Sequence, residues 1–185
     1  MLKRKLGMIA GVAGVLVAMS MPAMAGDSLV DEVRLGVYDH NTPMFGTRHE
    51  TNSPDLNAEA LFKSPDWLSW AFAPRPIIGA NINTGSGTSI GYAGLAWTWD
   101  FTQSLFLEGS FGGAIHNGHT SRPSGGARDR NNYGCRVMFH ESASVGYRFD
   151  AHVSVMFSVD HMSNASLCSS NPGLTDAGVR LGYSF

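Results

Sequence analysis

The chain has 185 residues and a formal net charge of −2, and 43% of its residues are hydrophobic. Residues 1–25 hold three of the 13 basic residues and none of the 15 acidic ones, which leaves 10 basic against 15 acidic residues and a net charge of about −5. This balance gives no indication of nucleic-acid binding, which would call for a basic face, and the remaining length fits one domain with a small core.

The first 25 residues have the pattern of a secretory signal peptide. A basic start at residues 3–5 precedes an apolar run at 6–19 and the Ala-Met-Ala pattern of a signal-peptidase site at 23–25. A retained membrane anchor is the competing interpretation, but the apolar run is short for a spanning helix of about 20 residues. We therefore predict a cleaved signal peptide and a single exported domain over 26–185.

The rest of the chain is a succession of short alternating runs rather than helical repeats. These runs are rich in Gly and aromatic residues and are separated by clusters of Pro, Gly, Asn and Asp, as in all-β proteins. Eight strands are predicted, at residues 29–38, 56–63, 76–84, 88–101, 104–116, 133–149, 151–164 and 175–185.

The connections between these strands differ in length in a regular way. The long ones fall at 39–55, 117–132 and 164–174, and the tight ones at 102–103 and 149–151. With alternating strands, the long connections lie on one side and the tight ones on the other, as in outer-membrane barrels with long outer loops and short periplasmic turns. The connection at 64–75, which carries Trp67 and Trp70, is longer than a periplasmic turn usually is.

The last four predicted strands have one apolar face and one face with charged and small polar residues. This alternation also fits a periplasmic sandwich. The end of the chain, Tyr183-Ser184-Phe185, looks like the terminal signal by which outer-membrane barrels are recognised for insertion, so we predict an eight-stranded antiparallel transmembrane β-barrel of the bacterial outer membrane. Side chains fill the interior of so small a barrel, which leaves the outer loops or the outer wall for function.

His161 and Ser163 are the first candidates for chemistry. Both have the parity of the apolar residues of their strand, so they should point outward, towards lipid, at the extracellular end. Residues two apart on a strand lie about 6.6 Å apart on one face, and an imidazole can span that gap to act as the base for a serine hydroxyl. The alternative is an ordinary polar pair at the membrane interface. A serine nucleophile that faces lipid would meet ester bonds near the headgroups.

The motifs around this pair resemble a known family. The segment His161-Met-Ser-Asn-Ala165, the turn Asn171-Pro-Gly173 and the closing Leu181-Gly-Tyr-Ser-Phe185 resemble the C-terminal signature of the lipid A 3-O-deacylase (PagL) family, and Gly146-Tyr-Arg-Phe149 resembles its preceding strand. The similarity covers residues 133–185. It implies an eight-stranded outer-membrane barrel that hydrolyses the ester-linked acyl chain at the 3 position of lipid A.

The resemblance also implies roles for particular residues. Ser163 would be the nucleophile and His161 the base, and Asn164 and Asn171, with nearby backbone N–H groups, are candidates to stabilise the oxyanion. The family has a glutamate twelve residues after the serine, where this chain has Thr175, which cannot supply a negative charge.

Two acidic residues are candidates for the missing third role. Asp176 is next in the chain, but regular alternation turns it inward, so it needs a bulge or a loop conformation to reach the histidine. Glu141 has outward parity in the neighbouring strand, and the tight 149–151 turn predicts that it lies opposite Val159, diagonal to His161, with Phe139 opposite His161. A dyad without an acid is the third possibility.

The two cysteines, Cys135 and Cys168, fall on neighbouring extracellular connections of an exported chain, where a disulfide can persist.

We expect no cofactor and no metal. The expected partners are lipid A or lipopolysaccharide as substrate and the outer-membrane lipids, with the site towards the extracellular leaflet. The sequence leaves open whether the chain is a monomer or a homodimer. A non-catalytic barrel with binding or adhesive loops and a phospholipase with the same Ser/His pair are the alternative functions.

Overall fold

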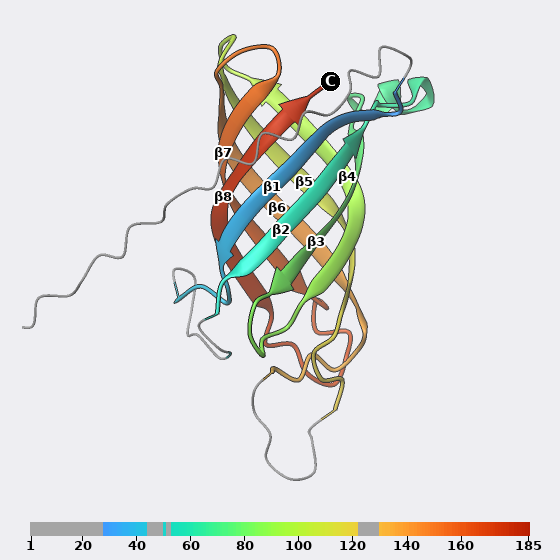
Figure 1. Ribbon diagram of the computed structural model, residues 1–185. Coiled ribbons are helices and arrows are strands. Elements are labelled where there is room, and N and C mark those ends of the chain that lie inside the picture. Colours follow the sequence, from blue (N-terminus) through green and yellow to red (C-terminus); the bar gives the residue numbers. More distant parts are fainter. Residues whose placement is uncertain (1–27, 44–49, 51–52, 122–129) are drawn as a thin grey trace, which may run out of the picture.

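In the computed structural model, eight antiparallel strands follow one another around a closed barrel (Figure 1). The structure describes residues 28–43, 50, 53–121 and 130–185, so the expected signal peptide and parts of two loops lie outside the described residues. Each strand pairs with the next one, and the last pairs with the first. The strands are β1 (Val30–Asp39), β2 (Asp55–Phe62), β3 (Arg75–Asn83), β4 (Ile90–Asp100), β5 (Leu105–His116), β6 (Val137–Arg148), β7 (Val153–Ser163) and β8 (Leu174–Ser184). All eight predicted strands are confirmed.

The two ends of the barrel differ in their connections. The connections before β2, β4, β6 and β8 gather at one end, which we call the loop end. The connections before β3, β5 and β7 lie at the other end together with the C-terminus, and we call it the turn end (Figure 1). The expected separation of long and tight connections is therefore confirmed. The long connection before β3 contains a short 3-10 helix, η2 (Asp66–Ala71).

The outer wall of the barrel is apolar. On β7 and β8 the side chains of Phe157, Val179 and Leu181 are exposed on the outside, while their neighbours Ser158 and Arg180 are buried inside. The same alternation holds around the barrel, as expected for strands with lipid on one face. Within the described residues, no helix has the length and apolar character of a membrane span.

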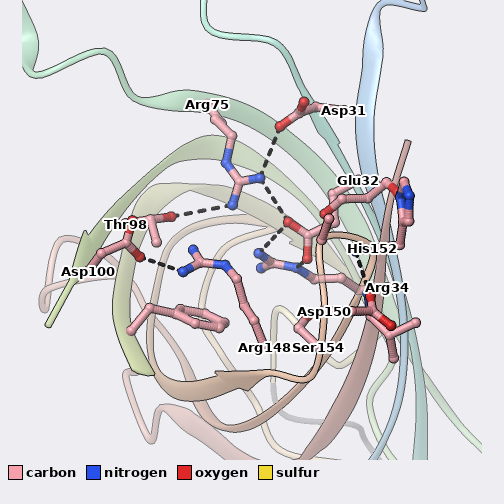
Figure 2. A pocket seen from close by; sticks show the side chains of 14 residues that line it. Asp31, Glu32, Arg34, Arg75, Thr98, Asp100, Arg148, Asp150, His152 and Ser154 are labelled. Atoms are coloured by element: carbon pink, nitrogen blue, oxygen red, sulfur yellow. Dashed lines mark hydrogen bonds and ion pairs between the residues drawn. The ribbon is translucent and has the colours of Figure 1, made fainter. Parts of the chain in front are cut away.

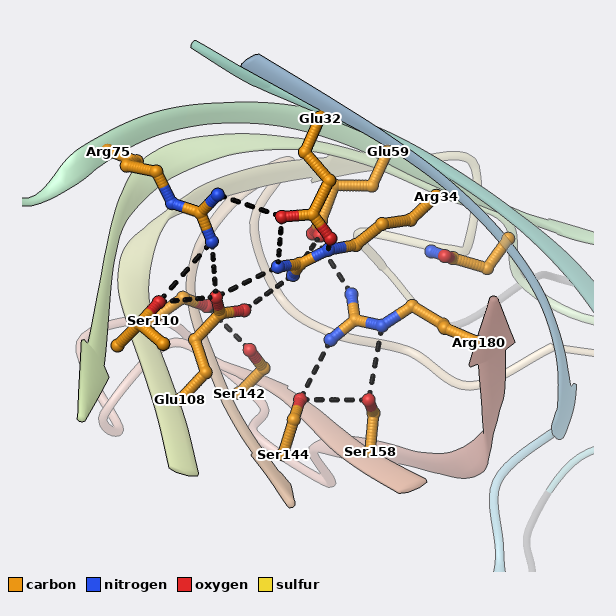
Figure 3. A network of polar contacts seen from close by, with 12 residues as sticks. Glu32, Arg34, Glu59, Arg75, Glu108, Ser110, Ser142, Ser144, Ser158 and Arg180 are labelled. Atoms are coloured by element: carbon orange, nitrogen blue, oxygen red, sulfur yellow. Dashed lines mark hydrogen bonds and ion pairs between the residues drawn. The ribbon is translucent and has the colours of Figure 1, made fainter. Parts of the chain in front are cut away.

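Charged side chains fill the barrel interior (Figure 3). The buried guanidinium of Arg34 contacts the carboxylates of Glu32, Glu59 and Glu108. Glu59 in turn accepts a hydrogen bond of 3.0 Å from Arg180, whose other nitrogens donate to serines of β6 and β7. Paired charges of this kind satisfy one another in place of water. As expected for eight strands, side chains fill the interior: this charged network and a cluster of buried apolar side chains that includes Tyr92 and Met138.

The register between β6 and β7 differs from the prediction. Phe139 pairs with Ser163, and Glu141 pairs with His161, which is a shift of two residues. The reason is the turn at the base of this hairpin, where the Asp150 carboxylate accepts hydrogen bonds from the backbone N–H groups of residues 152 and 153. This Asx-type turn spans four residues, 149–152, and not the three that were expected.

Candidate active site on the outer wall

The His161 and Ser163 side chains lie at the loop end of β7 on the outer wall. Both are half-buried, and Met162 between them points into the barrel and is buried. β7 pairs regularly with both of its neighbours up to this point, so the alternation that directs the two side chains outward is intact. The outward orientation expected from strand parity is therefore confirmed.

Thr175 holds the imidazole of His161 from the neighbouring strand. The two residues are a direct cross-strand pair between β7 and β8, and His161 Nδ1 lies 2.7 Å from Thr175 Oγ1. When the imidazole is neutral and Nδ1 carries the proton, this hydroxyl oxygen accepts a hydrogen bond from Nδ1–H, and Nε2 is free to act as a base. Thr175 thus orients the ring, and because its hydroxyl can donate or accept, it fits either tautomer of the neutral imidazole and brings no charge.

Gly173 makes room for the other edge of the ring. A Cβ atom at this position would lie 3.0 Å from His161 Cε1 and 3.6 Å from Nε2, and the residue has a φ of +68°, which glycine adopts without strain. Met162 pairs with Leu174, the first residue of β8. Ser163, the last residue of β7, and Gly173, just before β8, both lie one residue beyond this pair, towards the loop end. The Nε2 edge of the imidazole therefore faces Gly173, which lies at the same height along the barrel as Ser163.

Asp176 lies on the opposite face of β8 from Thr175. Its buried carboxylate accepts a hydrogen bond of 2.8 Å from the backbone N–H of Asn41 and lies 3.6 Å from His40 Nδ1. β8 contains no bulge that would turn it outward, since the pairing with β7 is regular through this position. The structure therefore does not bring Asp176 to His161.

Glu141 lies directly across from His161 on β6, closer than the diagonal position that we predicted. Its side chain is half-buried on the outer wall, and its Oε2 atom is buried with no hydrogen-bond partner among the described residues. A carboxylate oxygen without a partner is costly on a lipid-facing wall. The imidazole thus lies between a hydroxyl on one side and a carboxylate on the other.

Asn164 and Asn171 form a small network directly after Ser163. The Asn164 amide nitrogen Nδ2 donates to the carbonyls of Tyr133 and Ser170, both at 2.7 Å. The backbone N–H of Asn164 donates to Asn171 Oδ1 at 2.9 Å. The Asn164 side chain therefore fixes the loop. Its backbone N–H, directly after Ser163, and the exposed Asn171 amide to which it donates are the candidate donors of this network.

A disulfide ties this loop to the barrel. Cys135 and Cys168 are bonded, with 5.9 Å between their Cα atoms and a sequence separation of 33. The bridge joins the segment before β6 to the loop after β7, and Asn164 bonds to Tyr133 in the same pair of segments. The sequence left open whether the two cysteines are bridged, and the structure shows that they are.

An apolar groove of about 290 Å³ runs along the outer wall beside the candidate site. Its floor includes Gly112 and Gly113 of β5, and its walls include Phe139, which pairs with Ser163, and Asn164 and Leu167 of the adjoining loop. A second shallow groove, of about 380 Å³, adjoins it and shares Gly113. Residues without side chains thus open an apolar path that starts next to the serine.

A second cluster of titratable groups lies inside the loop end. His40, Asp55 and Asp176 have nitrogen and carboxylate oxygen atoms within 4.8 Å of one another, a spacing that a metal ion could use. His40 Nδ1 lies 2.9 Å from Asp55, and Nε2 lies 3.0 Å from Glu50. Burial by itself lowers the pKa of His40, but these hydrogen bonds and the charge of Asp176 raise it to about 10. The imidazolium thus already supplies the positive charge that these carboxylates require.

Glu50 joins this cluster to the other loops. Its carboxylate accepts hydrogen bonds from Thr88, from the backbone N–H of Asn131 and from the Tyr133 hydroxyl. Burial raises the pKa of Glu50, but its hydrogen bonds with His40 and with these three residues outweigh burial and lower the pKa to about 2. The cluster therefore links the connections before β2, β4 and β6 at the loop end.

The polar cavity at the turn end, of about 310 Å³, is a poor site for ester hydrolysis (Figure 2). Its arginines are engaged in ion pairs: Arg75 with Asp31 and Glu32, and Arg148 with Asp100. It belongs to the charged network of the interior and opens away from the lipid-facing wall.

Sequence reasoning missed the contacts that two residues, Thr175 and Gly173, make with His161. Thr175 has the same parity as Val179 and Leu181, so it points outward, beside His161. Because Thr175 carries no charge, Asp176 was considered for the third role instead. Gly173 was treated only as part of a turn. Its contact with the imidazole depends on the register between β7 and β8.

Comparison with known proteins gives a consistent result. The family model described as "Lipid A 3-O-deacylase (PagL)" matches residues 56–184, more than half of the chain. The chain is similar to the crystal structure of the outer membrane enzyme PagL, with a TM-score of 0.60 and 16% identity over 83% of this chain and 99% of the other. A de novo designed transmembrane β-barrel has a TM-score of 0.52 and 12% identity over 86% and 98%. These two likenesses concern the fold. No curated protein matches the sequence.

Proposed function

Since the chain belongs to the lipid A 3-O-deacylase (PagL) family, it is an ester hydrolase of the outer membrane, and we propose that Ser163 and His161 carry out its reaction. The reaction removes the ester-linked acyl chain at the 3 position of lipid A. The observation that carries the assignment of these residues is the imidazole, held on the outer wall through Nδ1 with its Nε2 edge towards the level of the serine.

In the proposed mechanism, the Ser163 hydroxyl oxygen attacks the ester carbonyl and passes its proton to His161 Nε2. The tetrahedral intermediate collapses, and the imidazolium returns the proton to the sugar oxygen that leaves. Water then attacks the acyl-serine ester with the same imidazole as base, which releases the fatty acid and regenerates the hydroxyl. In both halves Thr175 accepts the Nδ1–H hydrogen bond and keeps Nε2 directed at the reacting atoms.

Glu141 supplies the negative charge in this proposal. It faces His161 across the strand pair, and its unpartnered Oε2 would gain from the positive charge that the imidazole acquires during the reaction. Glu141 thus supplies the charge and Thr175 the orientation, from opposite sides of the His161 ring. Asp176 has no role in this mechanism, because its carboxylate is engaged by Asn41 and His40 inside the barrel.

The oxyanion is stabilised by the donors beside the nucleophile. The backbone N–H of Asn164 points at Asn171 Oδ1, and an oxyanion that takes the place of this oxygen would accept the same hydrogen bond. Displacement of Oδ1 turns the Asn171 amide, so that its NH₂ group becomes a second donor. Each such donor is commonly worth about 10²- to 10³-fold in rate.

The position of the pair on the outer wall supports a lipid substrate in the outer leaflet. We propose that the loop end is extracellular, so that the site lies at the level of the lipid A headgroup. The apolar groove that begins at Phe139 and Asn164 then receives the acyl chain that is to be removed. All of these residues come from one chain, so the proposed chemistry needs no second copy.

Mass spectrometry of lipid A tests the assignment. Lipid A is extracted from cells that express the wild type, Ser163→Ala or His161→Asn, and heat-dependent gel mobility of each barrel checks that it has folded. We expect the loss of one hydroxyacyl chain with the wild type only. An unchanged lipid A profile with a folded wild-type barrel, or deacylation by folded Ser163→Ala, would contradict the proposal. Parallel analysis of glycerophospholipids detects a phospholipase that uses the same pair.

A further inference from the structure

The connection between β2 and β3 at the turn end presents a group of exposed aromatic side chains that the proposed reaction does not use. Trp67 and Trp70 of η2 and Phe72 directly after it are 71%, 81% and 89% exposed. We call these three residues the aromatic foot. Leu68, in the same helical turn, is buried and attaches it to the barrel. Large apolar side chains displayed together mark a surface that normally has a partner.

The aromatic foot is attached to the outside of the barrel and does not cover its opening. Trp97 has outward parity on β4, because its neighbours Ala96 and Thr98 face the interior, where Thr98 donates to Glu108. The indole N–H of Trp97 donates a hydrogen bond of 2.9 Å to the carbonyl of Ala71 at the end of η2. Figure 1 shows this helical turn beside the strands at the end of the barrel that holds the C-terminus.

The backbone holds the foot in one conformation. Phe72 and Ala73 both have positive φ, of 65° and 48°, in a position where glycine is common after a helix. Their N–H groups donate to the carbonyls of Ser69 and Leu68, which satisfies the end of the helical turn. The exposed direction of Phe72 is therefore built into the chain and does not result from a loose loop.

The foot continues the lipid-facing wall of the barrel. Trp99 at the end of β4 and Phe101 after it are exposed on the same outer surface at the turn end, and Lys63 lies exposed at the start of the connection. Tryptophan with its amphipathic ring prefers the boundary between headgroups and acyl chains, and a lysine beside it can reach lipid phosphates. We propose that the aromatic foot is a membrane-binding site, seated in the headgroup–acyl boundary of the phospholipid leaflet at the turn end.

Fluorine NMR of the whole protein tests this placement. The chain has four tryptophans, and 5-fluorotryptophan gives each its own resonance, which single Trp→Phe variants assign. The protein is placed in phosphatidylcholine nanodiscs, and two relaxation agents are compared: a lipid with a nitroxide near its headgroup and a water-soluble gadolinium chelate. Ala151→Trp, in the tight and exposed turn at the same end, provides the aqueous reference. Trp→Phe variants are used only for assignment, so the bond from Trp97 to Ala71 is intact in the measured protein.

We expect the nitroxide lipid to broaden the Trp67 and Trp70 resonances, and the gadolinium chelate to broaden them several-fold less than the resonance at position 151. Broadening by the chelate equal to that at position 151, without an effect of the nitroxide lipid, would place the foot in water and overturn the proposal. Protection from both agents would also overturn it, since a second copy or another protein surface would then cover the foot. These outcomes are independent of lipid A deacylation.

Discussion

Thr175→Val removes the oxygen that accepts the His161 Nδ1–H hydrogen bond and preserves the shape of the side chain. In the proposed mechanism the imidazole then loses the contact of 2.7 Å that sets its orientation. The apolar packing on the outer wall is unchanged, because valine replaces the hydroxyl with a methyl group of similar size. The expected result is a folded barrel with a lower turnover number.

The size of the loss follows from the kind of bond. A hydrogen bond between neutral groups contributes about 0.5–1.5 kcal/mol, and each 1.36 kcal/mol changes a rate tenfold. We therefore expect kcat to fall by about two- to thirteenfold. Thr175→Glu replaces the neutral acceptor with a charged one, for which bonds of about 1.5–3 kcal/mol are typical. The gain of about 1–1.5 kcal/mol should raise kcat by about five- to thirteenfold over the wild type.

The assay measures release of the 3-hydroxyacyl chain from purified lipid A in detergent micelles by purified wild type, Thr175→Val, Thr175→Ser and Thr175→Glu. Thr175→Ser is the matched control, since it keeps the hydroxyl and loses only a methyl group, and it should retain most of the activity. Wild-type kcat in Thr175→Val would refute the reasoning, because turnover would then not depend on this hydrogen bond. A loss in Thr175→Ser as large as in Thr175→Val would assign the effect to packing.

Gly173→Ala should reduce activity strongly with little change in expression, because the added Cβ at this position of positive φ forces the His161 ring aside. The same release assay measures the activity, and full activity would show that the ring has room to move. Glu141→Gln keeps the shape and removes the charge, and a fall in kcat with unchanged KM is expected if the carboxylate stabilises the imidazolium. The His40 imidazole should keep its proton up to about pH 10, which NMR titration of its ring checks, and Glu50→Gln should lower the midpoint. The pKa of His40 is raised to about 10, so its contribution to the stability of the folded loop end should be lost as the pH rises through about 10; the pKa of Glu50 is lowered to about 2, so its contribution should be lost as the pH falls through about 2. Both contributions should be complete between about pH 4.5 and 6.5, and protease resistance of the loop end measures them.

The sequence by itself determined the barrel and the direction of its faces. Strict alternation of apolar and polar residues specifies strands with lipid on one side, and the placement of long and tight connections separates the two ends. For the same reason the sequence determined that His161 and Ser163 point outward, because parity is a local property of one strand. The spacing of His161 and Ser163 along one face of their strand likewise needed no tertiary information, because it follows from strand geometry.

Only the tertiary structure decided which residues of other strands meet His161. Register depends on the geometry of each turn, and the four-residue turn stabilised by Asp150 moved Glu141 from a diagonal position to one directly opposite the histidine. Pairing between β7 and β8 likewise selected Thr175 over Asp176, since adjacent residues on a strand face opposite sides of the wall. These contacts lie between strands, where a shift of one or two residues exchanges the partners, so residue identity in one segment could not settle them.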